Sequence, residues 1–319
     1  MKTISKKYLA LFMLVALVLF NACEKEEEVV YVNNNNSNIV LDFFKSNLND
    51  AKQITSVDLS SASYILGNKG AYIYISPCSF LDENGNSVTG VIDFELIEAQ
   101  TNLDMLKINR PTFTKDGQLL VSGGVVYVNA TQNGIALQIN PDCSLHANIQ
   151  SGVGTIDSKP MEYFVGSEDE NGVFAWEQEI SDTVTTILQD TTNSSGVSYG
   201  FPIDSVGWIN CDYFNGSVST TVLMELPSGY DGSNTQGFIY YSNINSLTGL
   251  YDFNQDGVFG SGAPVGMNVN FLSFSGDSIN GYYYNITPST IVSNHYEVIS
   301  TMKGPVTYAD LEILFDSNL

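Results

Sequence analysis

The chain has 319 residues, of which 12 are lysine or arginine and 35 are aspartate or glutamate, giving a formal net charge of −23 at pH 7. Nucleic acids and anionic membrane surfaces attract clustered lysine and arginine, so this charge argues against both as partners. The length predicts two domains, each with enough residues for its own core.

The first 22 residues have the pattern of a secretory signal peptide. Three lysines precede an unbroken apolar run from Tyr8 to Phe20, which is shorter than the roughly 20 residues of a membrane-spanning helix. Asn21-Ala22 then leads to Cys23. This arrangement resembles the lipobox of bacterial lipoproteins, although Phe20 and Asn21 differ from the usual Leu-Ser/Ala. The resemblance implies cleavage before Cys23 and its acylation, for example with palmitate, as a membrane anchor.

Residues 23–37 form a predicted tether, because an acidic run and four consecutive asparagines are too polar to bury a core. The acidic run from Glu24 to Glu28 resembles the export signal that sends Bacteroidota lipoproteins to the outer face of the outer membrane. The resemblance implies an outer-membrane lipoprotein that faces the cell exterior.

The apolar spacing from Ile39 to Ala51 fits either a short helix or a strand, and the sequence leaves both open. From Ile54 onward the apolar period becomes two. Ile92, Phe94 and Leu96 would share the buried face of one strand. Turns rich in glycine and asparagine separate such segments, which indicates an antiparallel sandwich.

A block of strand and turn residues between about positions 50 and 140 resembles the ZU5-like domain. It comprises Gln53–Asp58, Gly67–Gly70, Ile73–Phe80, Gly85–Gly90, Glu98, Asp104–Leu106, Leu119–Gly124 and Ala130. The resemblance implies a β-sandwich over residues 38–158 and carries no function. Some ZU5-containing proteins cleave themselves at His-Phe-Ser, a tripeptide that is absent here.

Residues 159–319 are predicted to form a second β-sandwich-like domain, with strand patterns resuming at Val197. Gly207–Phe214 and Ala263–Gly266 resemble the domain that follows ZU5-like domains in uncharacterised Bacteroidota lipoproteins. Near the C-terminus, Thr307 and Asp310 have the spacing of a capping box and predict a short closing helix. The sequence therefore predicts an all-β protein with two sandwiches behind a signal peptide and tether.

Three cysteines remain after Cys23, and they cannot all pair. Cys78 and Cys143 could form a disulfide in an oxidising compartment. Alternatively Cys78, Cys143 and Cys211 are buried free thiols, which is the interpretation we favour because spacing does not determine connectivity.

Asp252, Asn254 and Asp256, followed by Gly257, match the start of a calcium-binding loop. The bidentate glutamate expected at the twelfth loop position is replaced by Ala263. An Asp/Asn-rich turn explains the same residues, and we favour that explanation over a Ca²⁺ site. No other cofactor is expected.

Two groups of aromatic residues could offer a platform for sugar rings: Trp208, Tyr213 and Phe214, and the run Tyr282–Tyr284. Core packing is the favoured explanation for both. The sequence lacks the zinc-protease, serine-hydrolase and phosphate-loop motifs, which favours a protein that is not an enzyme.

Three hypotheses for function follow. The first is a lipid-anchored binding module of the cell surface for a protein or glycan, with its ligand-binding residues unidentified. The second is a structural or assembly accessory of an envelope complex. The third is a hydrolase with an unrecognised carboxylate pair. A groove lined with aromatic side chains would favour ligand capture, whereas two close acids in a deep pocket would favour hydrolysis.

Overall fold

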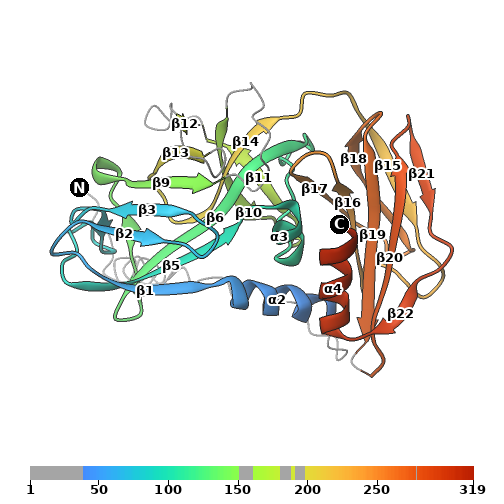
Figure 1. The fold of residues 1–319 in the computed structure, drawn as a ribbon, viewed down its shortest axis with the longest axis horizontal. Helices are drawn as coiled ribbons and strands as arrows, with labels where there is room; N and C mark the ends of the chain where they lie inside the picture. Colours follow the sequence, from blue (N-terminus) through green and yellow to red (C-terminus); the bar gives the residue numbers. More distant parts are fainter. Residues whose placement is uncertain (1–38, 151–160, 180–187, 191–197, 278) are drawn as a thin grey trace, which may run out of the picture. The chain divides into compact units, whose positions relative to one another are not determined.

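The computed structural model describes residues 39–150, 161–179, 188–190, 198–277 and 279–319 (Figure 1). These residues form mostly β-strands, with a short helix at the C-terminus, which confirms the predicted all-β class. The predicted lipid attachment at Cys23, the export signal Glu24–Glu28 and the tether lie outside them. No helix in the described ranges is long and apolar enough to cross a membrane.

The first sandwich packs a seven-stranded antiparallel sheet against a five-stranded one. The larger sheet contains β1 (Gln53–Asp58), β5 (Val91–Ala99), β6 (Leu120–Gln132), β7 (Ile135–Ala136), β10 (Glu162–Glu168), β11 (Phe174–Gln178) and β14 (Gly207–Phe214). The smaller contains β2 (Ser63–Leu66), β3 (Tyr72–Ile75), β9 (Leu145–Gln150), β12 (Leu188–Asp190) and β13 (Ser198–Ile203). The predicted alternation holds in β5, where Ile92, Phe94 and Leu96 all face the core between the sheets.

This sandwich crosses the domain boundary predicted between residues 158 and 159. β14 pairs with β6, β10 pairs with β14, and β13 pairs with β9, so strands from both predicted domains share each sheet. The first sandwich therefore continues to Phe214. The local pattern could not place this boundary, because the pairings join segments about eighty residues apart, such as Trp208 and Tyr127.

The second sandwich occupies the rest of the chain. Its three-stranded sheet contains β15 (Ser219–Glu225), β18 (Val258–Pro264) and β21 (His295–Val298). Its five-stranded sheet contains β16 (Thr235–Tyr241), β17 (Ser246–Leu250), β19 (Asn268–Asp277), β20 (Gly281–Thr290) and β22 (Lys303–Val306). A core of its own fills the space between these sheets.

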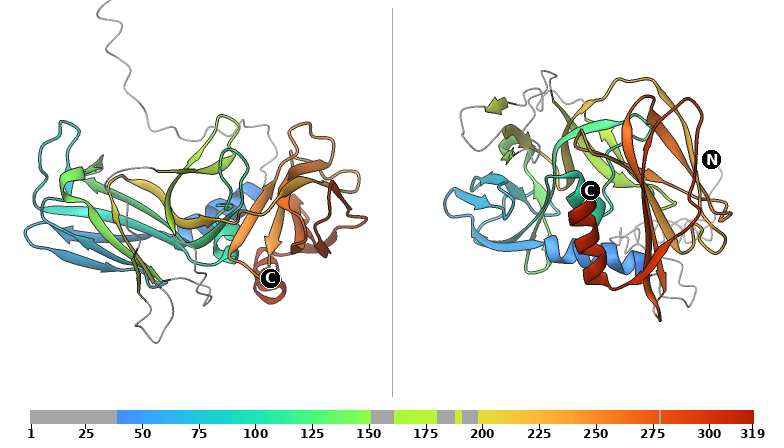
Figure 2. Two further views of the ribbon diagram at one scale, coloured as in Figure 1. Left: turned by 90° about the horizontal axis from the view of Figure 1, so that it is seen from above. Right: turned by 45° about the vertical axis from the view of Figure 1, so that its right-hand side comes forward.

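Three helices and an aromatic core join the two sandwiches. They are α2 (Ile39–Ala51), α3 (Asn102–Lys107) and α4 (Tyr308–Asn318), and α2 and α4 lie beside β19 and β20 (Figure 2). The segment whose conformation the sequence left open is thus a helix. The Phe43 ring of α2 packs edge-on against Phe274 of β19, with 5.3 Å between ring centroids. The predicted capping box of Thr307 and Asp310 begins α4. The side chains of Leu311 and Phe315 form the buried side of this helix.

Hydrogen bonds also connect the two sandwiches. The Thr112 N–H donates to the Leu247 carbonyl at 2.7 Å, and the Ser122 N–H donates to the Asn245 carbonyl at 2.9 Å. The Asn245 side-chain amide donates in return to the carbonyls of Gln100 and Ser122. Because buried carbonyls are costly to leave without partners, this seam opposes independent movement of the sandwiches.

Cys78 and Cys143 form a disulfide with 5.8 Å between their Cα atoms, so the favoured free-thiol interpretation is wrong for these two residues. β4 (Phe80–Leu81) pairs with β8 (Gln138–Ile139), and this long-range pairing brings the two cysteines together. Cys211 is a buried free thiol, as that interpretation expected.

Candidate functional site

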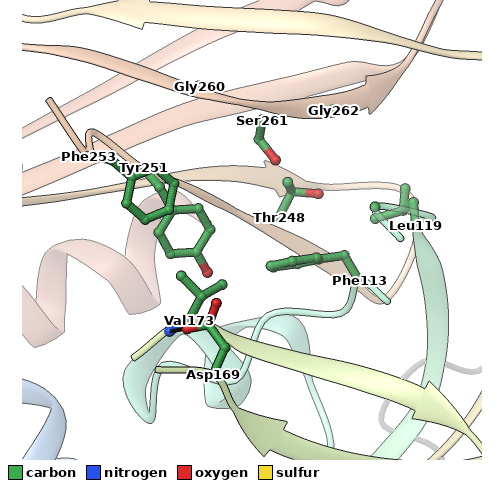
Figure 3. Close-up of a pocket in the computed structure, with 11 residues that line it drawn as sticks. Phe113, Leu119, Asp169, Val173, Thr248, Tyr251, Phe253, Gly260, Ser261 and Gly262 are labelled. Carbon is green, nitrogen blue, oxygen red and sulfur yellow. Dashed lines mark hydrogen bonds between the residues drawn. The ribbon is translucent and has the colours of Figure 1, made fainter. Parts of the chain in front are cut away.

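A pocket of about 250 Å³ is lined by elements of both sandwiches. Three aromatic side chains, Phe113, Tyr251 and Phe253, form much of its wall (Figure 3). Phe113 belongs to the segment before β6, whereas Tyr251 and Phe253 follow β17. Aromatic walls with a few polar groups are typical of sites for small organic ligands.

Hydrogen bonds from Trp176 of β11 and one bond of the seam hold the backbone of Phe113 in place. Its carbonyl accepts a hydrogen bond from the Trp176 N–H at 3.0 Å. The Trp176 indole N–H donates to the Pro111 carbonyl at 2.8 Å. The backbone bond between Thr112 and Leu247 lies between these two points. Phe113 is therefore fixed by backbone contacts on both sides.

Tyr251 is the central ring of the aromatic wall. Its backbone exchanges two hydrogen bonds with Gly260 of β18, at 3.2 and 2.9 Å. Its ring meets Phe113 edge-on at 6.2 Å, and Phe253 stacks nearly parallel to it at 5.8 Å. Phe253 is 69% exposed, so its outer face is open to solvent at the rim of the pocket.

The Tyr251 hydroxyl stays protonated at neutral pH. Burial raises its pKa, the carboxylates of Asp169 and Glu168 raise it further, and the Arg110 guanidinium lowers it. A protonated phenol both donates and accepts hydrogen bonds. The hydroxyl points toward Asp169 and Val173 in Figure 3.

Asp169 supplies the carboxylate among the residues that line the pocket. It begins the turn between β10 and β11, where its Oδ1 accepts the N–H groups of Asn171 and Val173, each at 2.9 Å. The neighbouring Glu168 is paired instead with Arg110 at 3.4 Å. The Arg110 guanidinium lies 4.5 Å from the ring centroids of both Phe174 and Trp208, which confines its charge outside the pocket lining.

The predicted calcium loop lies beside this pocket and contributes Phe253 to it. The Asp252 carboxylate is buried and accepts the N–H groups of Gly232, Asp256 and Gly257, at 3.0, 3.2 and 2.8 Å. Burial raises the pKa of this carboxyl, but these backbone hydrogen bonds together bring it below its ordinary value.

The oxygens of Asp252 therefore hold a tight turn. Asn254 is exposed, and Asp256 Oδ1 accepts the Val258 N–H at 3.1 Å. Within the described ranges, no group of three histidine, cysteine, aspartate or glutamate side chains is placed to hold a metal ion. These contacts fit the favoured turn explanation, and Ca²⁺ binding by Asp252, Asn254 and Asp256 stays a prediction.

The aromatic residues chosen from the sequence lie in other places. Tyr213 and Tyr282 are buried, and Trp208 packs against Tyr127 with 5.1 Å between ring centroids. Phe214 packs edge-on against Phe164 at 5.4 Å. The core explanation thus fits these residues. Sequence reasoning missed Phe113, Tyr251 and Phe253, although an aromatic residue inside the polar Asp252–Gly257 turn was a signal that could have identified Phe253.

A smaller hollow of about 40 Å³ contains two carboxylates, those of Asp93 and Glu95. Glu95 is paired with Lys52 at 3.0 Å, and Asp93 accepts the Ser56 hydroxyl at 2.9 Å. Both acids therefore have partners. The hollow also has less than a fifth of the volume of the aromatic pocket.

Neither a protein-family model nor a curated protein matches the chain. The pocket is therefore interpreted from its own residues.

Proposed function

We propose that the chain is a non-enzymatic, lipid-anchored binding module of the bacterial cell envelope, and that it takes a neutral sugar residue of a glycan into the aromatic pocket. The observation that carries this proposal is the wall formed by Phe113, Tyr251 and Phe253 beside a single carboxylate. Sugar rings present apolar C–H faces that pack on aromatic rings, while their hydroxyls require hydrogen-bonding partners.

The polar groups at the pocket suit such hydroxyls. Asp169 accepts hydrogen bonds, and the protonated Tyr251 hydroxyl can donate as well as accept. The hydroxyl of Ser261 extends from β18 toward the pocket (Figure 3). A carboxylate in a chain with a net charge of −23 disfavours an anionic ligand. A pocket of about 250 Å³ holds one ring rather than a long segment.

Two features support the proposed location in the cell envelope, namely the N-terminal sequence and the disulfide. The signal-peptide pattern and Cys23 support a lipid anchor in the outer membrane, with the acidic run after it directing the protein to the exterior. The disulfide between Cys78 and Cys143 supports an oxidising compartment. The relation of the first β-sandwich to the ZU5-like domain is part of this proposal and rests on the sequence resemblance.

The carboxylates give the hydrolase hypothesis little support. A glycosidase needs two acids on opposite sides of the bond it cleaves. The pocket lining has one carboxylate, Asp169, and the acids of the smaller hollow are both paired. A binding role therefore fits the described residues better than hydrolysis.

The test is calorimetric titration of the protein with a panel of neutral mono- and oligosaccharides. The variant Phe253→Ala removes the exposed ring without touching the core. Tyr296→Ala, on β21, is the matched control because Tyr296 is exposed and does not line the pocket. We expect binding of at least one sugar, weakened about tenfold by Phe253→Ala, which corresponds to about 1.4 kcal/mol. No binding across the panel, or equal binding by both variants, would refute the proposal.

A further inference from the structure

The outward face of the smaller sheet in the first sandwich carries two cross-strand rows of residues without an aspartate, glutamate, lysine or arginine. One row runs Tyr64, Tyr74, His146, Pro202 across β2, β3, β9 and β13. The next row runs Leu66, Tyr72, Asn148, Gly200. The alternating residues Ile65, Ile73 and Ala147 point into the core. The two rows form what we call the tyrosine face.

The ring of Tyr64 contacts the rings of both other tyrosines of this face, of which Tyr72 is exposed and Tyr74 is half-buried. The Tyr64 ring lies 5.1 Å from Tyr72 and 4.9 Å from Tyr74, measured between centroids. Tyr64 is 61% exposed, Leu66 70% and Tyr72 42%. Contiguous exposed apolar surface that is rimmed by polar residues is a feature of interaction sites. The residues that line the pocket come from other strands and loops, so the tyrosine face is a separate surface.

The charge of this surface indicates the kind of partner. Neither row contains an acidic or basic side chain apart from the imidazole of His146, although the whole chain has 35 acidic residues. A charged partner would find no counter-charge in these rows. The phenol hydroxyls, His146 and Asn148 instead offer hydrogen bonds across an aromatic surface. That combination suits an uncharged, hydroxyl-rich partner.

The shape of the tyrosine face suits a single polysaccharide chain better than the flat surface of a crystalline polysaccharide. Four neighbouring strands, about 4.8 Å apart, extend the face over roughly 14 Å, which is longer than one sugar ring. The Tyr64 ring plane is tilted by 34° from Tyr72 and by 49° from Tyr74. The three tyrosine rings lie on the adjacent strands β2 and β3 and form a tilted cluster rather than a plane. A tilted cluster suits a twisted, soluble chain better than the planar surface of a crystalline one.

We propose that the tyrosine face binds a soluble, uncharged polysaccharide chain by stacking its sugar rings on Tyr64, Tyr72 and Tyr74. The site goes beyond the proposed pocket, since it contacts the middle of a chain rather than enclosing one residue. Its failure is distinguishable from that of the pocket because the two sites share no residue.

Native gels containing laminarin, α-mannan or xylan test this proposal. All proteins carry Phe253→Ala, so that the weakened pocket contributes little to retardation and contributes equally in every variant compared. We expect at least one polysaccharide to retard this background protein, and we expect Tyr64→Ala with Tyr72→Ala to weaken the apparent affinity at least tenfold. The paired Tyr→Phe changes should retain most of the retardation, because they keep the rings. Tyr296→Ala is the surface control.

Two outcomes would overturn the proposal. The first is no retardation in any of the three gels, or equal retardation of the background protein and the alanine pair. The second is a dimer, seen by sedimentation, that the alanine pair disrupts while the gels show no retardation, since the tyrosine face would then bind a second copy of the chain. Circular dichroism of each variant confirms that it is folded before the gels are compared.

Discussion

Replacing Glu98 by alanine should loosen the turn that joins β2 and β3. The Glu98 side chain is 2% exposed, although glutamate is rarely buried. Its carboxyl oxygens accept the backbone N–H of Ala71 at 2.7 Å, the backbone N–H of Lys69 at 3.0 Å and the side-chain amide of Gln53 at 2.9 Å. One buried side chain thus holds residues that flank the tyrosine face.

The size of the effect follows from those donors. The Ala71 N–H is buried, and leaving such a donor without a partner costs about 1–3 kcal/mol. The bonds from Lys69 and Gln53 are partly buried, so water can replace the carboxyl there, at a loss of about 0.5–1.5 kcal/mol each. Together we expect Glu98→Ala to lower the free energy of unfolding by about 2–6 kcal/mol, a large fraction of a typical domain's total.

Urea unfolding at pH 7 measures this loss, and amide hydrogen exchange locates it. Exchange at the N–H groups of Lys69 and Ala71 should accelerate more than exchange in the second sandwich. The control is Glu177→Ala, since Glu177 pairs with Lys115 in an exposed salt bridge at 2.7 Å and should contribute less than about 1 kcal/mol. A loss below about 1 kcal/mol for Glu98→Ala, or unchanged exchange at both amides, would show that the carboxyl does not hold the turn.

Two further predictions concern a buried carboxyl and the disulfide. Burial raises the pKa of Asp212 well above its ordinary value, opposed by hydrogen bonds from the Ser122 hydroxyl and the Gly123 N–H. The stability that its bound proton contributes is therefore complete below the unfolded pKa of about 3.9 and is lost as the pH rises toward the folded pKa. Asp212→Asn should thus gain stability relative to the parent between pH 4 and 8, by up to about 1.4 kcal/mol per pH unit; a constant difference in urea unfolding would contradict this. Replacing Cys78 and Cys143 by alanine removes a covalent link between residues that are 65 positions apart in the sequence. The larger conformational entropy of the unfolded chain should lower the free energy of unfolding by about 4 kcal/mol. A urea unfolding curve that matches the parent would contradict this prediction.

Local patterns predicted the elements whose neighbours in sequence decide their structure. The alternation of Ile92, Phe94 and Leu96 identified β5, and the spacing of Thr307 and Asp310 identified the start of α4. The segment Ile39–Ala51 stayed ambiguous because its apolar residues fit two periods. It is a helix because its buried residues pack on the aromatic surface of β19, a partner more than two hundred residues away.

The site could not be predicted because it depends on three distant segments. Phe113, Asp169 and Tyr251 come from different parts of the chain, and no sequence motif relates them to one another. The disulfide could not be predicted for the same reason, because its two cysteines meet only when β4 pairs with β8. The acids of the calcium-like loop predicted a site instead. In the structure the Asp252 carboxylate accepts hydrogen bonds from the backbone N–H groups of Gly232 and Gly257.

The rigidity of the pocket decides how tightly so small a site can bind. Phe113 is fixed by backbone bonds from Trp176 and by the Thr112–Leu247 seam, and the Tyr251 backbone is paired with Gly260. Ordering flexible side chains costs about 0.5–1.5 kcal/mol each on binding. The rings of Phe113 and Tyr251 start from fixed backbones and contact each other, with 6.2 Å between their centroids. Phe253 is the exposed ring of the wall and is the one that a ligand would have to immobilise. Because the seam supplies this rigidity, a ligand that binds here should also raise the resistance of both sandwiches to unfolding together.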